Sequence, residues 1–227
     1  WDLESQKTNQ PIWKLANLPR PKPIMIPLTL SINSPQQMAK QAKASTFQTF
    51  KLKCAGDGLD ETRIQAVRQV CPNKTLLVDA NESWQQQDWA SWMDICETYH
   101  VTMVEQPFAR GHDSCLASTK TPFLVCADES CHTLDDLDQC QHYQMINIKL
   151  DKTGGLTHAL ELCKIARKKG FKIMVGCMLG SALAIRSAYY LAQVADLVDI
   201  DGPVLLKDAH ALVHYNLDKK NQFSIIE

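Results

Sequence analysis

The chain contains three short apolar runs that each lead into a carboxylate: TLLVDAN (75–81), VTMVEQP (101–107) and FLVCADES (123–130). An apolar run of this length, with a helical pattern on either side, is typical of a parallel β-strand buried on both faces. Each acid falls at the carboxyl end of its predicted strand, where α/β folds bind their ligands. The three acids are Asp79, Glu105 and Asp128. One such acid could be a helix cap, but three in succession suggest a site for a hard cation.

Further predicted strands flank these runs and bring the total to eight, with a helical pattern in nearly every gap. This alternation predicts an α/β fold in which eight parallel strands form a barrel. A doubly wound open sheet is the alternative, but it calls for a Gly-rich first turn that the sequence lacks. The strands are expected within 24–32, 49–55, 75–79, 101–105, 123–128, 145–153, 172–179 and 197–203, and the clearest helices within 35–44, 57–70, 156–169 and 181–195.

Three acids on consecutive strands supply oxygen ligands of the kind that Mg²⁺ prefers. The carboxyl ends of all strands of a parallel barrel converge on one face, so these side chains should lie close together. No His falls at a predicted strand end, which makes Zn²⁺ a poorer fit. We therefore expect one Mg²⁺ per barrel, held by Asp79, Glu105 and Asp128.

Three lysines are placed to act beside this site. Lys51 and Lys53 alternate with Leu52, so both should point to the same side of their strand. Lys149 holds the corresponding place on the sixth predicted strand, which lies opposite the second in an eight-stranded barrel. A neighbouring cation and a metal would lower the pKa of Lys53, so that its free amine could act as a base. A base on each face of a substrate suits removal and return of a proton next to a carboxylate.

Simpler interpretations of these lysines stay open. A K-x-K pattern is common on solvated strand edges, and Lys149 could form an ion pair with Asp151. A Schiff-base aldolase would need only one such lysine and no set of metal-binding acids.

A pair of aspartates ends the last predicted strand. Asp199 and Asp201 alternate with Ile200, so both carboxylates should lie on one side of the strand, as a receptor for an ammonium group would require. The alternative is that one of them caps a helix or forms the turn into Gly202-Pro203.

Composition limits the classes of partner. The 227 residues are 45% hydrophobic and 22% charged with a net charge of −1, so nucleic acid and an acidic membrane surface are not expected partners. Apolar runs are too short to span a bilayer. Nine scattered cysteines without C-x-x-C pairs indicate reduced thiols and a cytoplasmic location.

Taken together, these motifs resemble the muconate lactonizing subgroup of the enolase superfamily. The resemblance runs in register from Trp1 to about Pro203. It implies a (β/α)₇β TIM-like barrel with a separate capping domain. The matching motifs are KLK (51–53), VDAN (78–81), VEQP (104–107), ADES (127–130), NIKLDKTGG (147–155), VGCML (175–179) and DIDGP (199–203).

The resemblance also implies roles for individual residues. The three acids would be Mg²⁺ ligands, Lys53 and Lys149 the two acid/base lysines, and Lys51 a contact to the substrate carboxylate. The D-x-D motif resembles that of dipeptide epimerases, in which the pair holds the free amino group of the dipeptide. Other substrate contacts are implied at Thr29, Asn81 and Cys177, the last through its backbone.

The domain organisation that we expect has three parts. Residues 1–25 would be a linker helix and connector from a capping domain that the chain lacks, 26–203 the catalytic barrel, and 204–227 a tail that returns to the barrel mouth or packs outside it. The chain opens on Trp1 without an initiator Met, so it looks like the remainder of a longer protein. The capping domain would pack over the barrel mouth, and an uncapped barrel would expose apolar surface and could form a homo-oligomer.

The predicted function is metal-dependent epimerisation of the C-terminal residue of a small dipeptide such as L-Ala-D/L-Glu, as in murein peptide metabolism. Within the same superfamily, a cycloisomerase, an o-succinylbenzoate synthase or an N-acylamino acid racemase is an alternative. Substrates of those enzymes lack a free ammonium group, which leaves Asp199 and Asp201 unexplained. An inactive metal-binding barrel fragment is the non-catalytic alternative.

Overall fold

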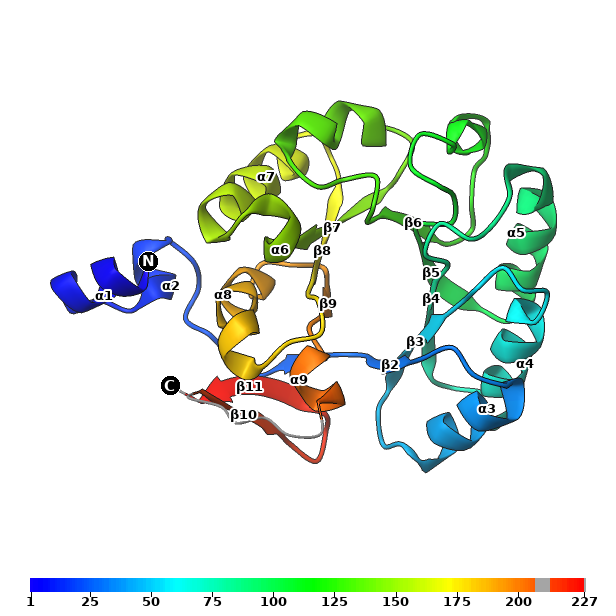
Figure 1. The fold of residues 1–227 in the computed structure, drawn as a ribbon, viewed down its shortest axis with the longest axis horizontal. Helices are drawn as coiled ribbons and strands as arrows, with labels where there is room; N and C mark the ends of the chain where they lie inside the picture. Colours follow the sequence, from blue (N-terminus) through cyan, green and yellow to red (C-terminus); the bar gives the residue numbers. More distant parts are fainter. Residues whose placement is uncertain (207–212, 227) are drawn as a thin grey trace.

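Eight parallel strands form a curled sheet in the computed structural model, which describes residues 1–206 and 213–226. The strands follow one another around the sheet in chain order, as a barrel built from successive β-α units requires (Figure 1). This confirms the predicted barrel. The strands are β2 (Leu28–Leu30), β3 (Thr49–Lys53), β4 (Thr75–Asp79), β5 (Val101–Glu105), β6 (Leu124–Ala127), β7 (Met145–Lys149), β8 (Lys172–Gly176) and β9 (Leu197–Asp199).

Helices surround the sheet and bury the outward faces of its strands (Figure 1). Ser34 caps the first of these outer helices, its hydroxyl accepting a hydrogen bond from the Gln37 amide at 3.3 Å. They are α3 (Pro35–Ala44), α4 (Asp60–Val70), α5 (Trp89–Thr98), α6 (Leu150–Thr153), α7 (Leu156–Lys168), α8 (Ala182–Ala192) and α9 (Gly202–Leu205), with 3₁₀ helices η1 (Gln86–Asp88), η2 (Ser114–Ser118) and η3 (Leu134–Cys140).

The interior of the barrel has two layers. Successive side chains of a strand point to opposite faces, so every second residue of each strand enters the barrel. The lower layer is an apolar floor made of Leu77, Met103, Cys126, Met145 and Met174, which form a cluster separate from the outer core. Two residues further along β4 and β5, the same inward face carries the carboxylates of the predicted site. The floor therefore supports the site from below.

The barrel is joined between its first and last strands by a side chain. No ladder pairs β2 with β9 among the described residues. Instead, the Thr29 backbone amide donates to Oδ2 of Asp201 at 2.7 Å, and both residues are buried. Asp201 thus takes the place of a strand partner at this seam.

The two ends of the predicted barrel differ from expectation. The first predicted strand, 24–32, divides at Pro27 because proline has no amide hydrogen to donate to a ladder. Its first part, β1 (Ile24–Met25), pairs with the tail strand β11 (Gln222–Ile226), which also pairs with β10 (His214–Leu217). The described tail therefore packs on the outside of the barrel against α8, while residues 207–212 and 227 lie outside the described residues.

Several predicted boundaries were too generous. The strands expected at 145–153, 172–179 and 197–203 end at Lys149, Gly176 and Asp199, because the chain then turns into α6, a loop and α9. The helix expected at 57–70 begins only at Asp60. The Asp60 carboxylate is occupied by the amides of Ala55 and Gly56, at 3.0 and 2.8 Å, and holds the preceding loop in a turn.

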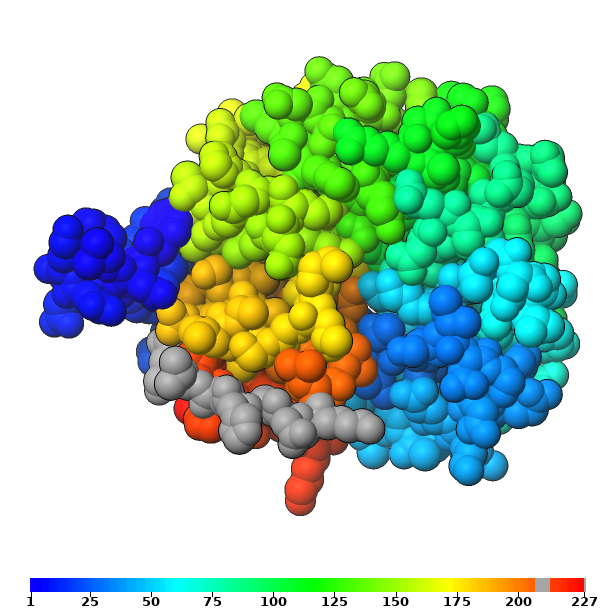
Figure 2. Space-filling view, in the orientation of Figure 1, coloured from blue at the N-terminus to red at the C-terminus, as the bar shows by residue number. Residues whose placement is uncertain are grey.

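The N-terminal helices α1 (Asp2–Thr8) and α2 (Ile12–Leu15) stand to one side of the rounded barrel (Figure 2). Trp1 donates from its indole to the Thr157 hydroxyl at 3.0 Å, and Asp2 pairs with Arg186 of α8. None of the residues of α1 is buried. In the part of the chain that the structure describes, no helix is long and apolar enough to span a membrane.

The floor makes a testable contribution to stability. Met174 is fully buried, so Met174→Ala should lower the free energy of unfolding by about 2–5 kcal/mol through lost contacts and a residual cavity. Met178 is 56% exposed, and Met178→Ala should change it by no more than about 0.5 kcal/mol. Urea unfolding of both variants measures the difference. Equal effects would show that the floor is not a packed layer.

Candidate functional site

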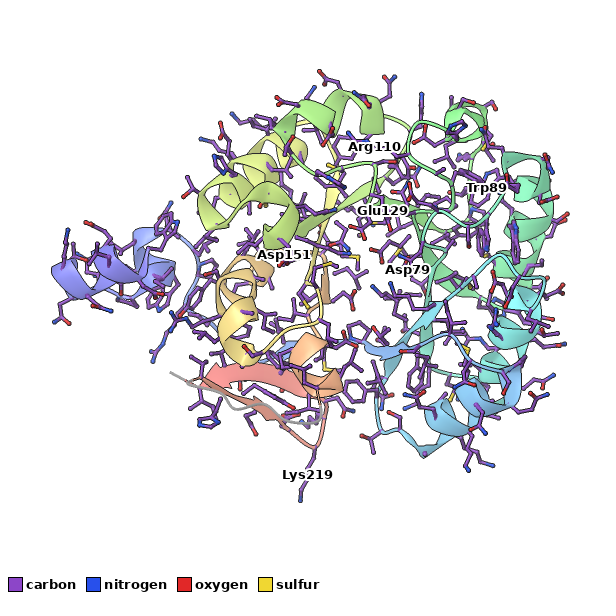
Figure 3. All side chains as sticks on the ribbon, viewed as in Figure 1. Asp79, Trp89, Arg110, Glu129, Asp151 and Lys219 are labelled. Atoms are coloured by element: carbon purple, nitrogen blue, oxygen red, sulfur yellow. The ribbon has the colours of Figure 1, made fainter. Side chains whose placement is uncertain are left out.

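The residues predicted from the sequence meet at the carboxyl ends of the strands, around a cavity of 680 Å³. Asp79 and Glu105 lie beneath this cavity and are fully buried. In Figure 3, Asp79 and Glu129 lie beside the open centre of the ring of strands, whereas Trp89 lies among the outer helices. The predicted residues that line the cavity are Thr29, Lys51, Lys53, Asn81, Asp128, Lys149, Cys177, Asp199 and Asp201.

Lys51 connects the acids of three strands. Its ammonium contacts Asp199 closely, and it lies 3.3 Å from Oε2 of Glu105 and 3.4 Å from Oδ2 of Asp79. Burial alone would lower the pKa of Lys51, but these carboxylates outweigh it and raise the pKa well above the ordinary value. Lys51 is therefore a permanent positive charge at the centre of the site.

Lys53 lies on the same side of β3, closer to solvent, as the alternation predicted. Its ammonium donates to Oδ2 of Asp79 at 2.6 Å and to Oδ1 of Asn81 at 3.0 Å. Asn81 has a left-handed backbone, with φ of 43°, and its amide donates to Oδ1 of Asp79 at 3.1 Å. Its side chain also donates to Glu129 at 3.2 Å. Asn81 therefore orients the ammonium group of Lys53. The predicted contact of Asn81 with the substrate stays a prediction.

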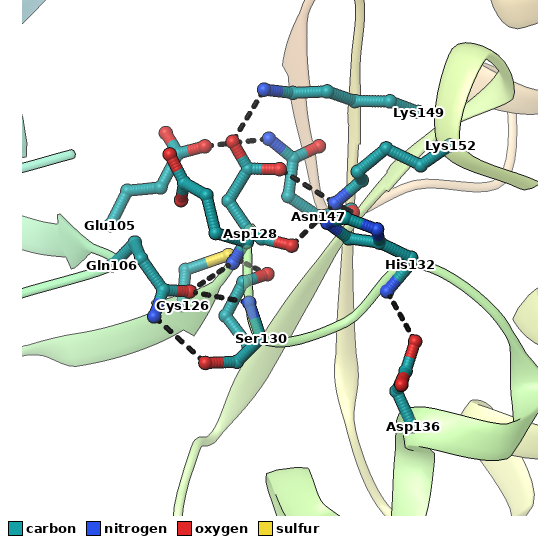
Figure 4. A network of polar contacts seen from close by, with 12 residues as sticks. Glu105, Gln106, Cys126, Asp128, Ser130, His132, Asp136, Asn147, Lys149 and Lys152 are labelled. Carbon is teal, nitrogen blue, oxygen red and sulfur yellow. Dashed lines mark hydrogen bonds and ion pairs between the residues drawn. The ribbon is translucent and has the colours of Figure 1, made fainter. Parts of the chain in front are cut away.

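Asp128, which follows β6, contacts two lysines, Lys149 and Lys152 (Figure 4). Lys149 contacts Oδ2 of Asp128, and Lys152 donates to Oδ1 at 2.6 Å. Burial alone would raise the pKa of Asp128, but Lys152 and Lys149 outweigh it and hold the pKa well below its usual range. Burial would likewise lower the pKa of Lys149, but Asp128 and Glu105 raise it. In this arrangement Lys149 holds its proton.

Glu105 is an acid whose charged form is disfavoured by its surroundings. Burial raises its pKa to about 8, with a further contribution from the Asp79 carboxylate. Lys51 contacts Oε2, and Asn147 donates to Oε1 at 2.7 Å. An added positive charge near Asp79, Glu105 and Asp128 would relieve this repulsion.

The charge inventory of the site fits a divalent cation. Four lysines, Lys51, Lys53, Lys149 and Lys152, face six acids, which are Asp79, Glu105, Asp128, Glu129, Asp199 and Asp201. With every acid ionised, the site has a formal excess of two negative charges, and burial together with this crowding raises the pKa of Glu105. Within residues 1–206 and 213–226, no group of three His, Cys, Asp or Glu side chains is arranged to hold a metal as it stands. Lysine ammonium groups contact the acids instead. The acids are buried oxygen donors of the kind that Mg²⁺ takes, so the donor chemistry fits and the predicted ligand roles stay a prediction.

The two aspartates after β9 lie side by side at the seam of the barrel. One oxygen of each is engaged, Oδ2 of Asp199 by Lys51 and Oδ2 of Asp201 by the Thr29 amide. Oδ1 of Asp199 is buried without a hydrogen-bond partner. Burial and the Asp199 charge raise the pKa of Asp201 to about 6. The pair thus carries unneutralised negative charge that an ammonium group can satisfy.

Two other predicted contacts lie at the edge of the cavity. Thr29 faces it from β2, with its amide already donated to Asp201. Cys177 follows β8, and burial together with Asp199 raises the pKa of its thiol to about 12. A neutral thiol is a poor nucleophile, and the contact through the Cys177 backbone stays a prediction.

Three residues that support the acids were not predicted. Gln106 accepts from the Asp128 and Ser130 amides at 2.9 and 3.0 Å, Asn147 holds Glu105, and Lys152 holds Asp128. Sequence signals existed only in part: Asn147 precedes Lys149 by two residues and so shares its face of β7. The role of Gln106 depends on the loop after β5 and that of Lys152 on the helical turn α6, and neither geometry follows from strand periodicity.

Comparison with known proteins places this barrel among relatives of defined activity. A protein named N-acetyl-D-glutamate racemase, from Pseudoalteromonas sp., is 40% identical over 92% of this chain and 66% of its own length. A protein named L-Ala-D/L-Glu epimerase, from Escherichia coli K12, is 39% identical over 91% of this chain and 65% of its own length. The chain therefore spans slightly less than two thirds of these relatives.

Solved structures agree with the sequence relatives. An enolase family member from Agrobacterium tumefaciens, with homology to dipeptide epimerases and with bound sodium and L-Ala-L-Glu, superposes with a TM-score of 0.92 at 34% identity over 97% of this chain and 68% of that one. A dipeptide epimerase from Cytophaga hutchinsonii, complexed with Mg and D-Ala-L-Val, gives 0.90 at 25% identity over 98% and 64%.

A family model described as "Enolase C-terminal domain-like" matches residues 35–218, which is most of the chain. The match includes β3 to β9 and every predicted site residue except Thr29. This chain belongs to the enolase C-terminal domain-like family.

Proposed function

We propose that the intact protein epimerises the C-terminal residue of a small dipeptide by removing and returning the proton next to its carboxylate. The placement of two lysines carries this proposal. Lys53 ends β3 and Lys149 ends β7, and three strands separate them on either path around the eight-stranded barrel. The two ammonium groups therefore reach the cavity from opposite sides. A substrate held between them presents one face to each lysine.

In this scheme the lysines move the proton and the other residues hold the substrate. One lysine takes the α-proton from one face of the substrate, and the other returns a proton to the opposite face, so the configuration inverts. Lys51 contacts the substrate carboxylate and stabilises the negative charge that develops there. The buried position of Lys51, 3% exposed, keeps water from screening this charge.

Asp79, Glu105 and Asp128 would hold Mg²⁺. When bound, the ion supplies positive charge that stabilises the developing negative charge of the substrate carboxylate. The formal excess of two acids over lysines and the raised pKa of Glu105, which a cation would lower, support this assignment. The Mg reported for the dipeptide epimerase from Cytophaga hutchinsonii is consistent with it.

Asp199 and Asp201 would receive the free ammonium group of the dipeptide. The unpartnered Oδ1 of Asp199 provides an acceptor, and the charge of Asp201 provides the attraction. The Escherichia coli relative is named L-Ala-D/L-Glu epimerase, and we take this dipeptide as the substrate to test first. A role in murein peptide metabolism follows from that substrate.

A second candidate is racemisation of an N-acylated amino acid. The Pseudoalteromonas relative is named for such a substrate and is 40% identical to this chain. An N-acyl group carries no positive charge, so it would leave Asp199 and Asp201 without a counter-ion. The charge of this pair makes the dipeptide the better candidate.

The mouth of the barrel presents apolar side chains that support two further expectations. Met178, Leu179 and Leu205 are 56, 67 and 37% exposed and line the cavity. Cover by a capping domain or by a second copy of the chain would bury them. We also propose a cytoplasmic location, because all nine cysteines are free thiols.

Exchange of the α-proton with solvent tests the main proposal. In D₂O with Mg²⁺, the intact protein should exchange the α-proton of the C-terminal residue of L-Ala-L-Glu and of L-Ala-D-Glu. Proton NMR measures the exchange as loss of the α-proton signal. Lys53→Ala and Lys149→Ala should each lower epimerisation by about 100-fold or more, because each removes one acid/base group.

The matched control is Lys169→Ala, which removes an exposed lysine paired with Asp138 outside the site and should leave exchange unchanged. Exchange of neither epimer by the wild-type protein would contradict the proposal and favour a non-catalytic barrel.

Asp201→Asn separates the two candidate functions. An asparagine oxygen can still accept from the Thr29 amide, so the seam is kept while the charge is lost. KM for L-Ala-D-Glu should rise about 10-fold or more, while turnover of N-acetylglutamate, if any, should change little. Asp151→Asn, at an exposed acid of α6, is the control. An unchanged KM for the dipeptide would rule out the ammonium receptor.

The pKa of Asp201 predicts the acid limb of the activity. Because this pKa is raised to about 6, the carboxylate is charged above pH 6 and becomes neutral below it. Attraction of the substrate ammonium group is therefore present above this pH and lost below it. We expect kcat/KM for the dipeptide to fall as the pH drops through about 6, and Asp201→Asn to remove this limb. If kcat/KM of the variant still falls as the pH drops through about 6, a group other than Asp201 causes the fall.

A further inference from the structure

We propose that Lys152 is a positioning residue that fixes the direction of the Asp128 carboxylate and, through it, the ammonium group of Lys149. The inference rests on the proposed function, because it concerns one of the two proton-transferring lysines. Lys152 then affects proton transfer only on the face of the substrate that Lys149 serves.

All three donors of the Lys152 ammonium group have acceptors. They go to Oδ1 of Asp128 at 2.6 Å, to the Asp128 carbonyl at 2.7 Å and to the Asn147 carbonyl at 2.9 Å (Figure 4). An ammonium group has three donors, so none is left for a substrate. The side chain is 12% exposed. Lys152 therefore acts on other residues rather than on the bound molecule.

Lys152 continues the connection between two strands where their backbone ladder stops. The described pairing of β6 with β7 ends at Ala127 and Ile146, one residue before Asp128. Beyond that point, Lys152 links the carbonyl of Asp128, after β6, to the carbonyl of Asn147, in β7. The amide of Asp128 is held from the other side by Gln106 at 2.9 Å. The backbone of Asp128 is thus held at both its amide and its carbonyl.

The turn that carries Lys152 directs its side chain to this place. The single helical turn α6 directly follows β7, and the amides of Gly154 and Gly155 both donate to the Leu150 carbonyl at 3.0 Å. Gly154 has φ of 79°, a left-handed conformation that ends the turn and that glycine adopts without strain. Lys149 and Lys152 are three residues apart and so lie on one side of the turn.

The arrangement makes the two faces of the site unequal. Asp128 has one oxygen bound by Lys152 and the other by Lys149, so rotation of its carboxylate would break both contacts. Lys53, on the other face, is held by Asp79 and Asn81. No described contact joins Lys152 to either of these residues. Loss of Lys152 should therefore disturb Lys149 and spare Lys53.

Face-resolved proton exchange tests this inference on the intact protein with Mg²⁺. Initial loss of the α-proton in D₂O is measured separately from L-Ala-L-Glu and L-Ala-D-Glu, and Lys149→Ala identifies the epimer that Lys149 serves. Lys152→Met should slow exchange of that epimer about 10-fold more than exchange of the other. Lys152→Arg, which keeps charged donors, should restore the ratio to within about three-fold.

Two controls and a replacement variant separate positioning from other causes. Lys169→Met removes an exposed lysine outside the site and should leave both rates unchanged. Calorimetric titration of Lys152→Met with Mg²⁺ measures any loss of affinity, about 10–100-fold at most because Lys152 holds the Asp128 carboxylate, and both exchange rates are taken at saturating Mg²⁺. Where Lys152→Met does not fold, as judged by circular dichroism, Lys152→Gln replaces it, because its amide keeps two N–H donors without the charge.

The outcomes are distinct. Equal slowing of both epimers, with or without weaker Mg²⁺ binding, would overturn the inference, because Lys152 would then act on the whole site. Unchanged rates for both epimers would overturn it as well. If the wild-type protein exchanges neither epimer, the proposed function itself fails and the inference falls with it.

Discussion

The ammonium group of Lys51 is the charge on which the open end of this barrel depends. It lies among carboxylates from β4, β5 and β9, so it links strands that are not neighbours in the sheet. Isolated charges of either sign would be costly at this depth, and they persist because each has partners of the opposite sign. Lys53, Lys149 and Lys152 extend the same arrangement around the ring. The result is a fixed polar layer in which carboxyl groups outnumber lysines by two.

Much of this arrangement follows from strand periodicity. Asp79, Glu105 and Asp128 each follow an apolar run, and a parallel barrel must bring such residues to one face. The K-x-K and D-x-D patterns place alternate residues on one side of a strand, and the structure has Lys51 and Asp199 in direct contact. These are local rules applied to a topology in which neighbouring strands follow one another. Predicting these positions did not require the conformation of the loops.

The remainder was out of reach for physical reasons. Gln106 acts from a left-handed backbone, with φ of 38°, and reaches Ser130 across the neighbouring strand, which no pattern of apolar residues encodes. Lys152 appears in the sequence as one more lysine of a helical turn, and its three acceptors are brought together only by the fold. The division of the first strand at Pro27 depends on which neighbour each half finds, a question of tertiary pairing.

The separation of the barrel interior into an apolar floor and a polar layer has a consequence for how such a fold can change over evolution. Leu77, Met103, Cys126, Met145 and Met174 contact one another below the site and supply no chemical group to it. Three of the five are methionines, whose unbranched side chains adapt to altered neighbours. Substitutions in the layer above, apart from those at the seam residue Asp201, can therefore be absorbed without repacking this floor. Proteins descended from one ancestral barrel can change substrate preference while they keep the same apolar floor.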